Sequence, residues 1–244
     1  MNATPSSVDL PVPARALAIG AHPDDIEFGC GATLAKWARA GCEAHMLVLT
    51  DGSKGTWDAH ADLEALVALR VEEQRAAASV LGAVEVHFLG ETDGELTEDR
   101  LTRARICEVV RRTRPGVVFT HDPWKPYRLH PDHRHAGFVV IDALVAARDP
   151  HFFAEQAVPH HRPDALLLFE AEIVDHIERV DNTVDTKVDA LLAHRSQWRS
   201  THRIDDDPVH QTEAFRRRIT DRAREFAAAA TLDGLAEGFK QLTL

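Results

Sequence analysis

Two short motifs of histidine and aspartate are the parts of this sequence best suited to chemistry. HPDD at 22–25 and HPDH at 130–133 each place polar side chains three residues apart in a compact turn. Because proline fixes one backbone angle, such a turn can point its first and last side chains at one position. Zinc accepts imidazole and carboxylate ligands, and a catalytic zinc has three protein ligands and one open position for water. Two histidines and one carboxylate from these motifs would meet that requirement.

The segments around the motifs alternate between strand and helix patterns. Expected strands cover residues 14–22, 43–52, 84–90, 116–122 and 164–172, and the pattern at 176–183 allows a sixth. Expected helices cover residues 29–41, 63–81, 97–114, 133–148, 184–198 and 212–230. Strands separated by helices predict an α/β fold, a Rossmann-like three-layer sandwich with a mostly parallel sheet.

The order of such a sheet would bring the two motifs together. HPDD follows the first expected strand and HPDH comes after the fourth, and a Rossmann-like order places these strands side by side. Ligands bind beyond the carboxyl ends of the strands at that point, so we expect both motifs at one rim. We expect one domain over residues 1–244, with 1–14 as a flexible N-terminal arm and 149–163 as a lid or an interface arm.

The composition narrows the class of partner. A net charge of -11 argues against nucleic acid and anionic membranes as main partners. There is no run of 18 apolar residues, and the N-terminal residues lack the basic start and apolar block of a signal peptide, so we expect a cytoplasmic protein. The three cysteines form no CxxC pair, which excludes a cysteine-rich zinc site. The sequence is compatible with a homo-oligomer as well as with a monomer.

Three segments of the sequence resemble one known family. AHPDDIEFGCGATLAKWARAG, VLTDGSKG and HPDHRHAG are similar to segments of the PIG-L (LmbE-like) zinc deacetylases. The resemblance continues through LRVEEQRAAASVLG, which contains Arg70, and through the later HRSQW segment. It implies a Rossmann-like fold, one metal ion per chain and hydrolysis of an acetamide on a glucosamine unit.

The resemblance also assigns the metal ligands. It implies that His22, Asp25 and His133 bind the metal, which would be Zn²⁺, with Fe²⁺ as an alternative in the cell. On the residues alone, either Asp24 or Asp25 could be the carboxylate ligand. Bound zinc lowers the pKa of water to about 7, which fits a hydrolase.

Three further residues of the motifs have catalytic roles by the same resemblance. Asp24 would be the general base that takes a proton from water. His130 would stabilise the oxyanion or protonate the leaving amine, and Asp132 would orient His130. A pure metal-binding module would need the ligands but not this spare carboxylate and spare imidazole.

Substrate contacts are expected from three more positions. Arg70 and Asp93 match sugar-binding residues of the family, and Tyr127 lies near the expected site. The alternative for Arg70 is a solvated helix arginine paired with Glu73, and Asp93 is also an ordinary turn residue.

Three functions follow from these residues. The first is a zinc-dependent deacetylase acting on an N-acetylglucosamine-type sugar of a soluble small molecule, such as a thiol cofactor precursor or a natural-product glycoside. The second is an amidase that removes a larger N-acyl group, as in a thiol conjugate of a glucosamine unit. The third is a non-enzymatic metal-binding module.

Other histidines are assigned more modest roles. His121 ends the fourth expected strand and is placed to contact the metal ligands rather than the metal itself. His45 and His87 lie within strands and are interpreted as packed core or edge residues.

Overall fold

The computed structural model describes residues 5–244, and eight strands of this range form one sheet. The strands are β1 (Ser7–Val8), β2 (Arg15–Gly20), β3 (Glu43–Thr50), β4 (Glu85–Glu91), β5 (Val117–His121), β6 (Ala165–Phe169), β7 (His176–Arg179) and β8 (Ala236–Thr243). Their order is β1-β7-β8-β6-β5-β2-β3-β4, and only the pairings of β8 with β6 and β7 are antiparallel. The sheet is therefore mostly parallel, as expected.

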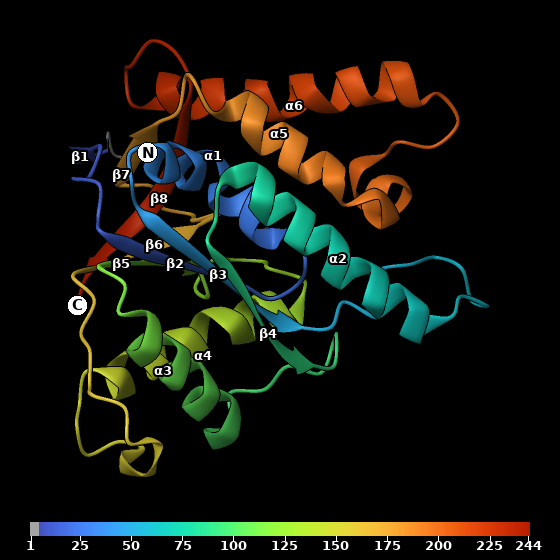
Figure 1. The fold of residues 1–244 in the computed structure, drawn as a ribbon. Coiled ribbons are helices and arrows are strands. Elements are labelled where there is room, and N and C mark those ends of the chain that lie inside the picture. The colour runs from blue at the N-terminus through green and yellow to red at the C-terminus, as the bar shows by residue number, and fades with distance from the viewer. Residues whose placement is uncertain (1–4) are drawn as a thin grey trace.

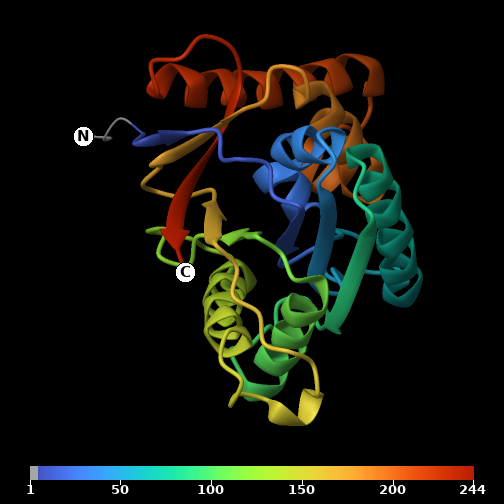
Figure 2. The same cartoon turned by 60° about the vertical axis from the view of Figure 1, so that its left-hand side comes forward.

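Helices cover both faces of the sheet (Figures 1 and 2). The helices are α1 (Asp25–Arg39), α2 (Leu63–Leu81), α3 (Arg100–Thr113), α4 (Pro131–Ala147), α5 (Val184–Ala193) and α6 (Pro208–Ala229), with short turns at 154–156, 195–197 and 198–202. Side chains of β2 alternate between the faces: Ala16 and Ala18 pack toward α1 and α2, and Leu17 and Ile19 pack toward α3 and α4. This alternation produces the expected three layers.

Helix α2 shows how local sequence sets an element's bounds. It begins after Asp62, whose side chain accepts a hydrogen bond from the backbone N–H of Ala65, and it ends at Gly82, whose φ of 80° is left-handed. Both ends agree with the expected helix. Helix α3 begins at Arg100, three residues later than the expected start at residue 97, because the side chain of Asp99 accepts hydrogen bonds from the first helical N–H groups.

The C-terminal strand β8 was not expected, because the last third of the chain reads as mainly helical. The segment contains glutamate, glycine and lysine, which favour strands weakly. Strand β8 enters the sheet antiparallel between β6 and β7. Part of the expected N-terminal arm is also a strand, since β1 pairs with β7; residues 1–4 of that arm lie outside the described residues.

The central pairing places the two motifs at one rim. Strand β2 pairs directly with β5, in parallel register from Ala16 opposite Val117 to Ala18 opposite Phe119. HPDD follows β2 and HPDH follows β5, so both lie beyond the carboxyl ends of adjacent strands. In the described part of the chain, no helix is long and apolar enough to cross a membrane.

Candidate metal centre and active site

The HPDD turn connects β2 to α1 with almost no intervening chain. Helix α1 begins at Asp25, earlier than expected, and the backbone N–H of Asp25 bonds to the carbonyl of His22 at 3.3 Å. Asp24 has φ of 96°, a left-handed backbone that costs free energy in any residue other than glycine. Such strain persists only where neighbouring contacts fix the backbone, and these contacts are described below for Arg70 and Gln74.

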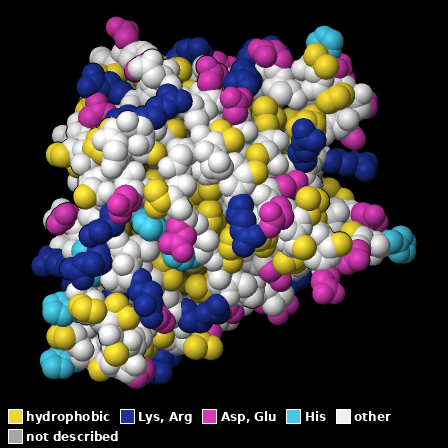
Figure 3. All heavy atoms as spheres, viewed as in Figure 1, with side chains coloured by type: hydrophobic (Ala, Val, Ile, Leu, Met, Phe, Trp, Pro, Cys, Tyr) yellow, Lys and Arg dark blue, Asp and Glu magenta, His cyan; other side chains and the backbone are white. Residues whose placement is uncertain are grey.

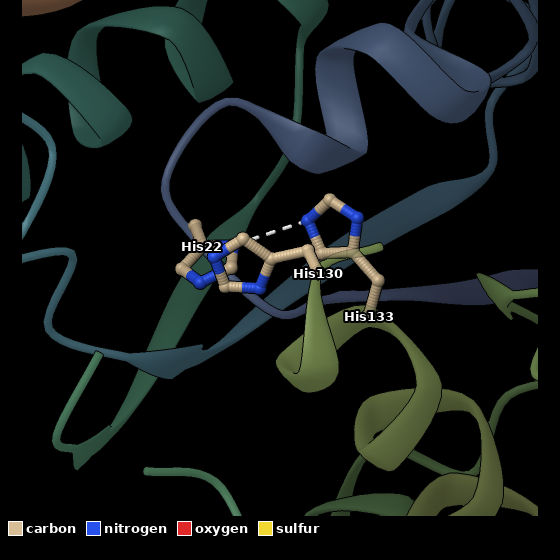
Figure 4. Close-up of side chains that lie close together, drawn as sticks. All are labelled: His22, His130 and His133. Atoms are coloured by element: carbon tan, nitrogen blue, oxygen red, sulfur yellow. Dashed lines mark hydrogen bonds between the residues drawn. The ribbon is translucent and has the colours of Figure 1, made fainter. Parts of the chain in front are cut away.

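The three expected ligands converge on one point. His22 Nδ1 lies 3.2 Å from Asp25 Oδ2 and 3.2 Å from His133 Nε2. His133 Nε2 lies 3.2 Å from Asp25 Oδ1, which closes the triangle. Figure 4 shows the rings of His22 and His133 joined by a dashed line, with the ring of His130 beside them.

This triangle fits a metal ion. Ligand atoms about 2.0–2.1 Å from a tetrahedral zinc lie about 3.3 Å from one another, close to the three observed separations. Imidazole nitrogens 3.2 Å apart can both bind one cation through their lone pairs when neither nitrogen carries a proton. The residues present therefore fit a His₂Asp metal centre with one position left for water.

The charges around His22 also favour a cation. Burial alone would lower the pKa of His22, but the carboxylates of Asp132, Asp25 and Asp93 raise it well above its usual value. The pKa of Asp25 is well below its usual value because His133 and His121 outweigh the effect of burial. A site this negative attracts protons, and it attracts a divalent cation for the same reason.

Side chains behind the ligands fix their orientation. His22 Nε2 lies 3.1 Å from both Asp132 Oδ2 and Asp93 Oδ1, so its Nδ1 is left for the metal. Buried His121 contacts Asp25 Oδ2 at 3.2 Å through Nε2, as expected from its place at the end of β5. Arg128 donates to His121 Nδ1 at 3.0 Å.

Asp132 is placed differently from the expectation. It accepts hydrogen bonds from the backbone N–H groups of Gly94 and Leu96 and contacts His22, while no hydrogen bond joins it to His130 among residues 5–244. The two residues differ in position: Asp132 is buried in the first turn of α4, whereas His130 precedes the helix and is exposed. Asp132 thus holds the ring of His22, an expected metal ligand, and not that of His130.

Asp24 is buried beside a buried arginine. Burial raises the pKa of Asp24 to about 6, although the positive charge of Arg70 opposes the rise. Arg70 NH2 lies 3.9 Å from Asp24 Oδ2 and donates to the carbonyl of Pro23 at 2.6 Å. A Cβ on Gly55 would collide with the guanidinium, so this glycine makes room for it.

Gln74, one helical turn after Arg70, was not singled out from the sequence. Its Oε1 accepts from the backbone N–H of Asp24 at 3.1 Å, and its Nε2 donates to Glu27 Oε1 at 2.6 Å. Arg70 and Gln74 lie four residues apart on one face of α2, and together they bind the carbonyl and the N–H of the peptide group that joins Pro23 to Asp24. Glu73 contacts Ser196, so the alternative Arg70–Glu73 pair is absent from the described structure.

His130 lies at the mouth of the site. Its ring centroid is 4.6 Å from that of His22 and 4.9 Å from that of His133. Burial and the charges of His22 and His133 lower the pKa of His130, in contrast to that of His22. A third imidazole therefore lies beside the expected metal position without belonging to the triangle.

An open cavity of about 510 Å³ gives access to these groups. Arg70 and Asp93 line it, as do Lys54, Gln197 and Thr201. Lys54 donates its backbone N–H to Asp93 Oδ2 at 2.9 Å, so the TDGSKG loop supports one rim. The cavity would expose a substrate to both carboxylate and cationic groups.

Two expected parts of the site are not in this lining. Tyr127 has a side chain that is 96% exposed and a left-handed φ of 59°. Neither Tyr127 nor any residue of 149–163 is among the described residues that line the cavity. Arg111 instead holds the 149–163 segment against α3 and α4 through the carbonyls of Asp149, Phe152 and Phe153, which accounts for its distance from a lid position.

Fold and site together define a class. A mostly parallel sheet holds a His₂Asp triangle at the pairing of β2 with β5, with a further carboxylate and a further imidazole beside it. That is the donor set of metal-dependent hydrolases. The model of the PIG-L family, described as GlcNAc-PI de-N-acetylase, matches residues 17–144, and the chain belongs to this family.

Relatives with described activities also support membership of the chain in this family. A diacetylchitobiose deacetylase of Thermococcus kodakarensis is 36% identical over 187 residues, which are 75% of this chain and 70% of that protein. A 1D-myo-inositol 2-acetamido-2-deoxy-alpha-D-glucopyranoside deacetylase of Kineococcus radiotolerans is 35% identical over 179 residues, 60% of this chain and 49% of that one. The structure of N,N'-diacetylchitobiose deacetylase from Pyrococcus horikoshii, solved with its inhibitor MPG, matches this chain with a TM-score of 0.84 and 28% sequence identity. The match covers 95% of this chain and 84% of that one.

Proposed function

We propose that this protein is a zinc-dependent deacetylase that hydrolyses the acetamide of an N-acetylglucosamine-type sugar carried by a soluble small molecule. The proposal rests mainly on the close approach of His22, Asp25 and His133, in which each pair of residues has donor atoms 3.2 Å apart, at a cavity that Asp24 and His130 also line. Family membership and the deacetylase relatives supply the reaction class.

His22, Asp25 and His133 would hold the metal. When bound, zinc polarises a carbonyl and lowers the pKa of water to about 7. Two nitrogens and one carboxylate suit zinc, and Fe²⁺ also accepts this donor set. The contacts from Asp132 and His121 keep the ligands oriented before the metal arrives, so binding requires little rearrangement.

Asp24 is the proposed general base. Its carboxylate lines the cavity next to the metal position, and its raised pKa of about 6 makes it a better proton acceptor than an ordinary aspartate. Water that loses a proton to Asp24 attacks the acetyl carbon, and Asp24 can return the proton to the departing amine. Arg70 keeps the carboxylate in place through its contacts on either side.

His130 is the proposed partner of the acetyl oxygen. It belongs to the HPDH motif, whereas Asp24 belongs to HPDD, and its ring centroid lies 4.6 Å from that of His22. As the carbonyl oxygen becomes negative, an imidazole N–H of His130 can donate to it. Protonation of the leaving amine is the other role open to the same ring.

The rim residues would set the substrate. Arg70, Asp93 and Lys54 offer donors and acceptors for sugar hydroxyls within one cavity. A site built from such groups rejects analogues that lack the hydroxyls, because buried polar groups are then left unpaired. Tyr127, which is fully outside the lining, would contact only the part of a substrate that projects from the cavity.

The deciding experiment is an assay of acid release with the zinc-loaded protein. N-acetylglucosamine, diacetylchitobiose and an inositol glycoside of N-acetylglucosamine would be offered beside the same sugars with longer N-acyl groups. We expect acetate from at least one N-acetyl sugar. Cleavage of a bulky N-acyl sugar at least about tenfold faster, a barrier difference of about 1.4 kcal/mol, would replace deacetylase by amidase. Failure of every compound with zinc bound would favour a metal-binding module.

A further inference from the structure

A second cluster of metal-binding side chains lies at the opposite end of the sheet. His45 on β3 and Glu85 and His87 on β4 bring ligand atoms within 4.8 Å of one another. We propose that these three residues bind a second divalent transition metal of the zinc type. The site is independent of the catalytic proposal, because it uses none of the same residues.

The sheet geometry brings the three side chains to one face. His45 lies directly opposite Glu85 in the parallel register of β3 and β4, and His87 follows Glu85 by two residues. Side chains two residues apart on a strand share a face, so all three project from the same side. The site lies at the start of β3, and Thr50 at the end of that strand is about 16 Å further along.

The distances between the nitrogen and oxygen atoms of the three side chains are compatible with binding of one metal ion. His45 Nδ1 is 3.7 Å from Glu85 Oε2, and His87 Nε2 is 3.5 Å from the same oxygen. These separations are too long for good hydrogen bonds and slightly longer than the about 3.3 Å between ligands of a tetrahedral zinc. A small closing movement around a cation would bring all three atoms to bonding distance.

Both imidazoles have a ring nitrogen that needs a partner. His45 Nδ1 and His87 Nε2 are buried atoms without a hydrogen-bond partner in the part of the chain that the structure describes. Leaving such atoms unpaired is costly, and a metal would satisfy both at once. Because the carboxylate of Glu85 is more than half exposed, an ion can enter from solvent on its side.

The surrounding charges permit a cation. The charged side chains that act on His45 are Glu85 and Glu43, which are negative, and Arg15, which is positive. The donors are two nitrogens and one carboxylate, a set that selects zinc, cobalt or nickel over calcium or magnesium.

Counting bound zinc tests the proposal. The protein would be stripped with a chelator, dialysed against micromolar Zn²⁺ and analysed for zinc per chain. We expect two equivalents in the wild type and one in His22→Ala/His133→Ala, which removes the catalytic ligands. Adding His45→Gln and His87→Gln to that background should remove the remaining equivalent. His151→Gln/His160→Gln, at two exposed histidines elsewhere, is the matched control and should leave the count unchanged.

Thermal unfolding gives a second measurement. Zinc bound between β3 and β4 stabilises only the folded chain, so Zn²⁺ should raise the Tm of His22→Ala/His133→Ala. The same addition should not raise the Tm once His45 and His87 are glutamine. Absence of zinc from the His22→Ala/His133→Ala protein, or an unchanged zinc count after both glutamine substitutions, would overturn the site. Circular dichroism would verify that each variant is folded.

Discussion

The segments that lead from the sheet to the metal differ sharply after β2 and after β5. The HPDD turn after β2 is buried, and its strained backbone at Asp24 is held by Arg70 and Gln74. The segment 122–130 after β5 exposes Tyr127 and Leu129 before it reaches His130. The difference teaches that buried contacts fix the backbone on one side of the site, while the segment on the other side presents exposed side chains; under the proposed function, the first would set the geometry of the reaction and the second would meet the substrate.

The distribution of charge also differs between the surface and the buried side of the site. On the face in Figure 3, acidic and basic side chains are interspersed and no broad patch of one sign stands out. Strong local charge is concentrated instead in the buried side of the metal centre, where Asp25, Asp93 and Asp132 surround His22. Four predictions test the contrast between the two segments.

The largest effect should come from a ligand. His133→Ala removes one corner of the donor triangle, so we expect loss of bound zinc and a fall in kcat/KM of at least about a thousandfold, since the metal contributes several kcal/mol to the barrier. Elemental analysis and acetate release measure the two losses. His135→Ala, two residues further along α4, is the control. Full zinc in the His133 variant would remove this residue from the ligand set.

Asp24→Asn should separate metal binding from chemistry. The amide keeps the size of the carboxylate but does not accept the proton, so we expect turnover to fall about 10²–10⁴-fold while zinc stays bound. Zinc per chain and kcat would be measured on the same preparation. If kcat is nearly normal, the general base is another group.

Gln74→Leu should loosen the HPDD turn without touching the substrate. It leaves the Asp24 N–H and the Glu27 carboxylate without their buried partner, which should cost about 1–3 kcal/mol of stability. We also expect a lower kcat with little change in KM, because Asp24 loses its fixed position. Urea unfolding and steady-state kinetics provide the numbers, with exposed Arg75→Ala on the same helix as control. Unchanged kcat alongside reduced stability would show that the turn keeps its geometry without this clamp.

The smallest effect should be at Tyr127. Because the side chain is almost wholly exposed, Tyr127→Phe should change the free energy of unfolding by less than about 0.5 kcal/mol. KM for N-acetylglucosamine itself should stay the same. A higher KM confined to larger glycosides would support contact with the projecting part of the substrate, whereas a loss of kcat on every substrate would contradict the contrast between the segments.

The sequence by itself determined most of the central elements and the two motifs that come together, while the resemblance to the family supplied the choice of Asp25 as the carboxylate ligand. Apolar runs, caps and glycines fixed α2 and the strands before both motifs, because these signals act over a few residues. The pairing of β2 with β5 followed from the alternation of strands and helices. The meeting of His22 with His133 was therefore predictable from the motifs and their positions.

Only the tertiary structure decided which side chains surround those ligands. Gln74 is an ordinary helix residue in the sequence, and its role exists because α2 packs beside the HPDD turn. Asp132 was expected to orient His130, but its place at the start of α4 directs it to His22. Strand β8 joins the sheet through partners more than fifty residues away. Contacts of this kind depend on distances between remote segments, which local propensity and spacing do not encode.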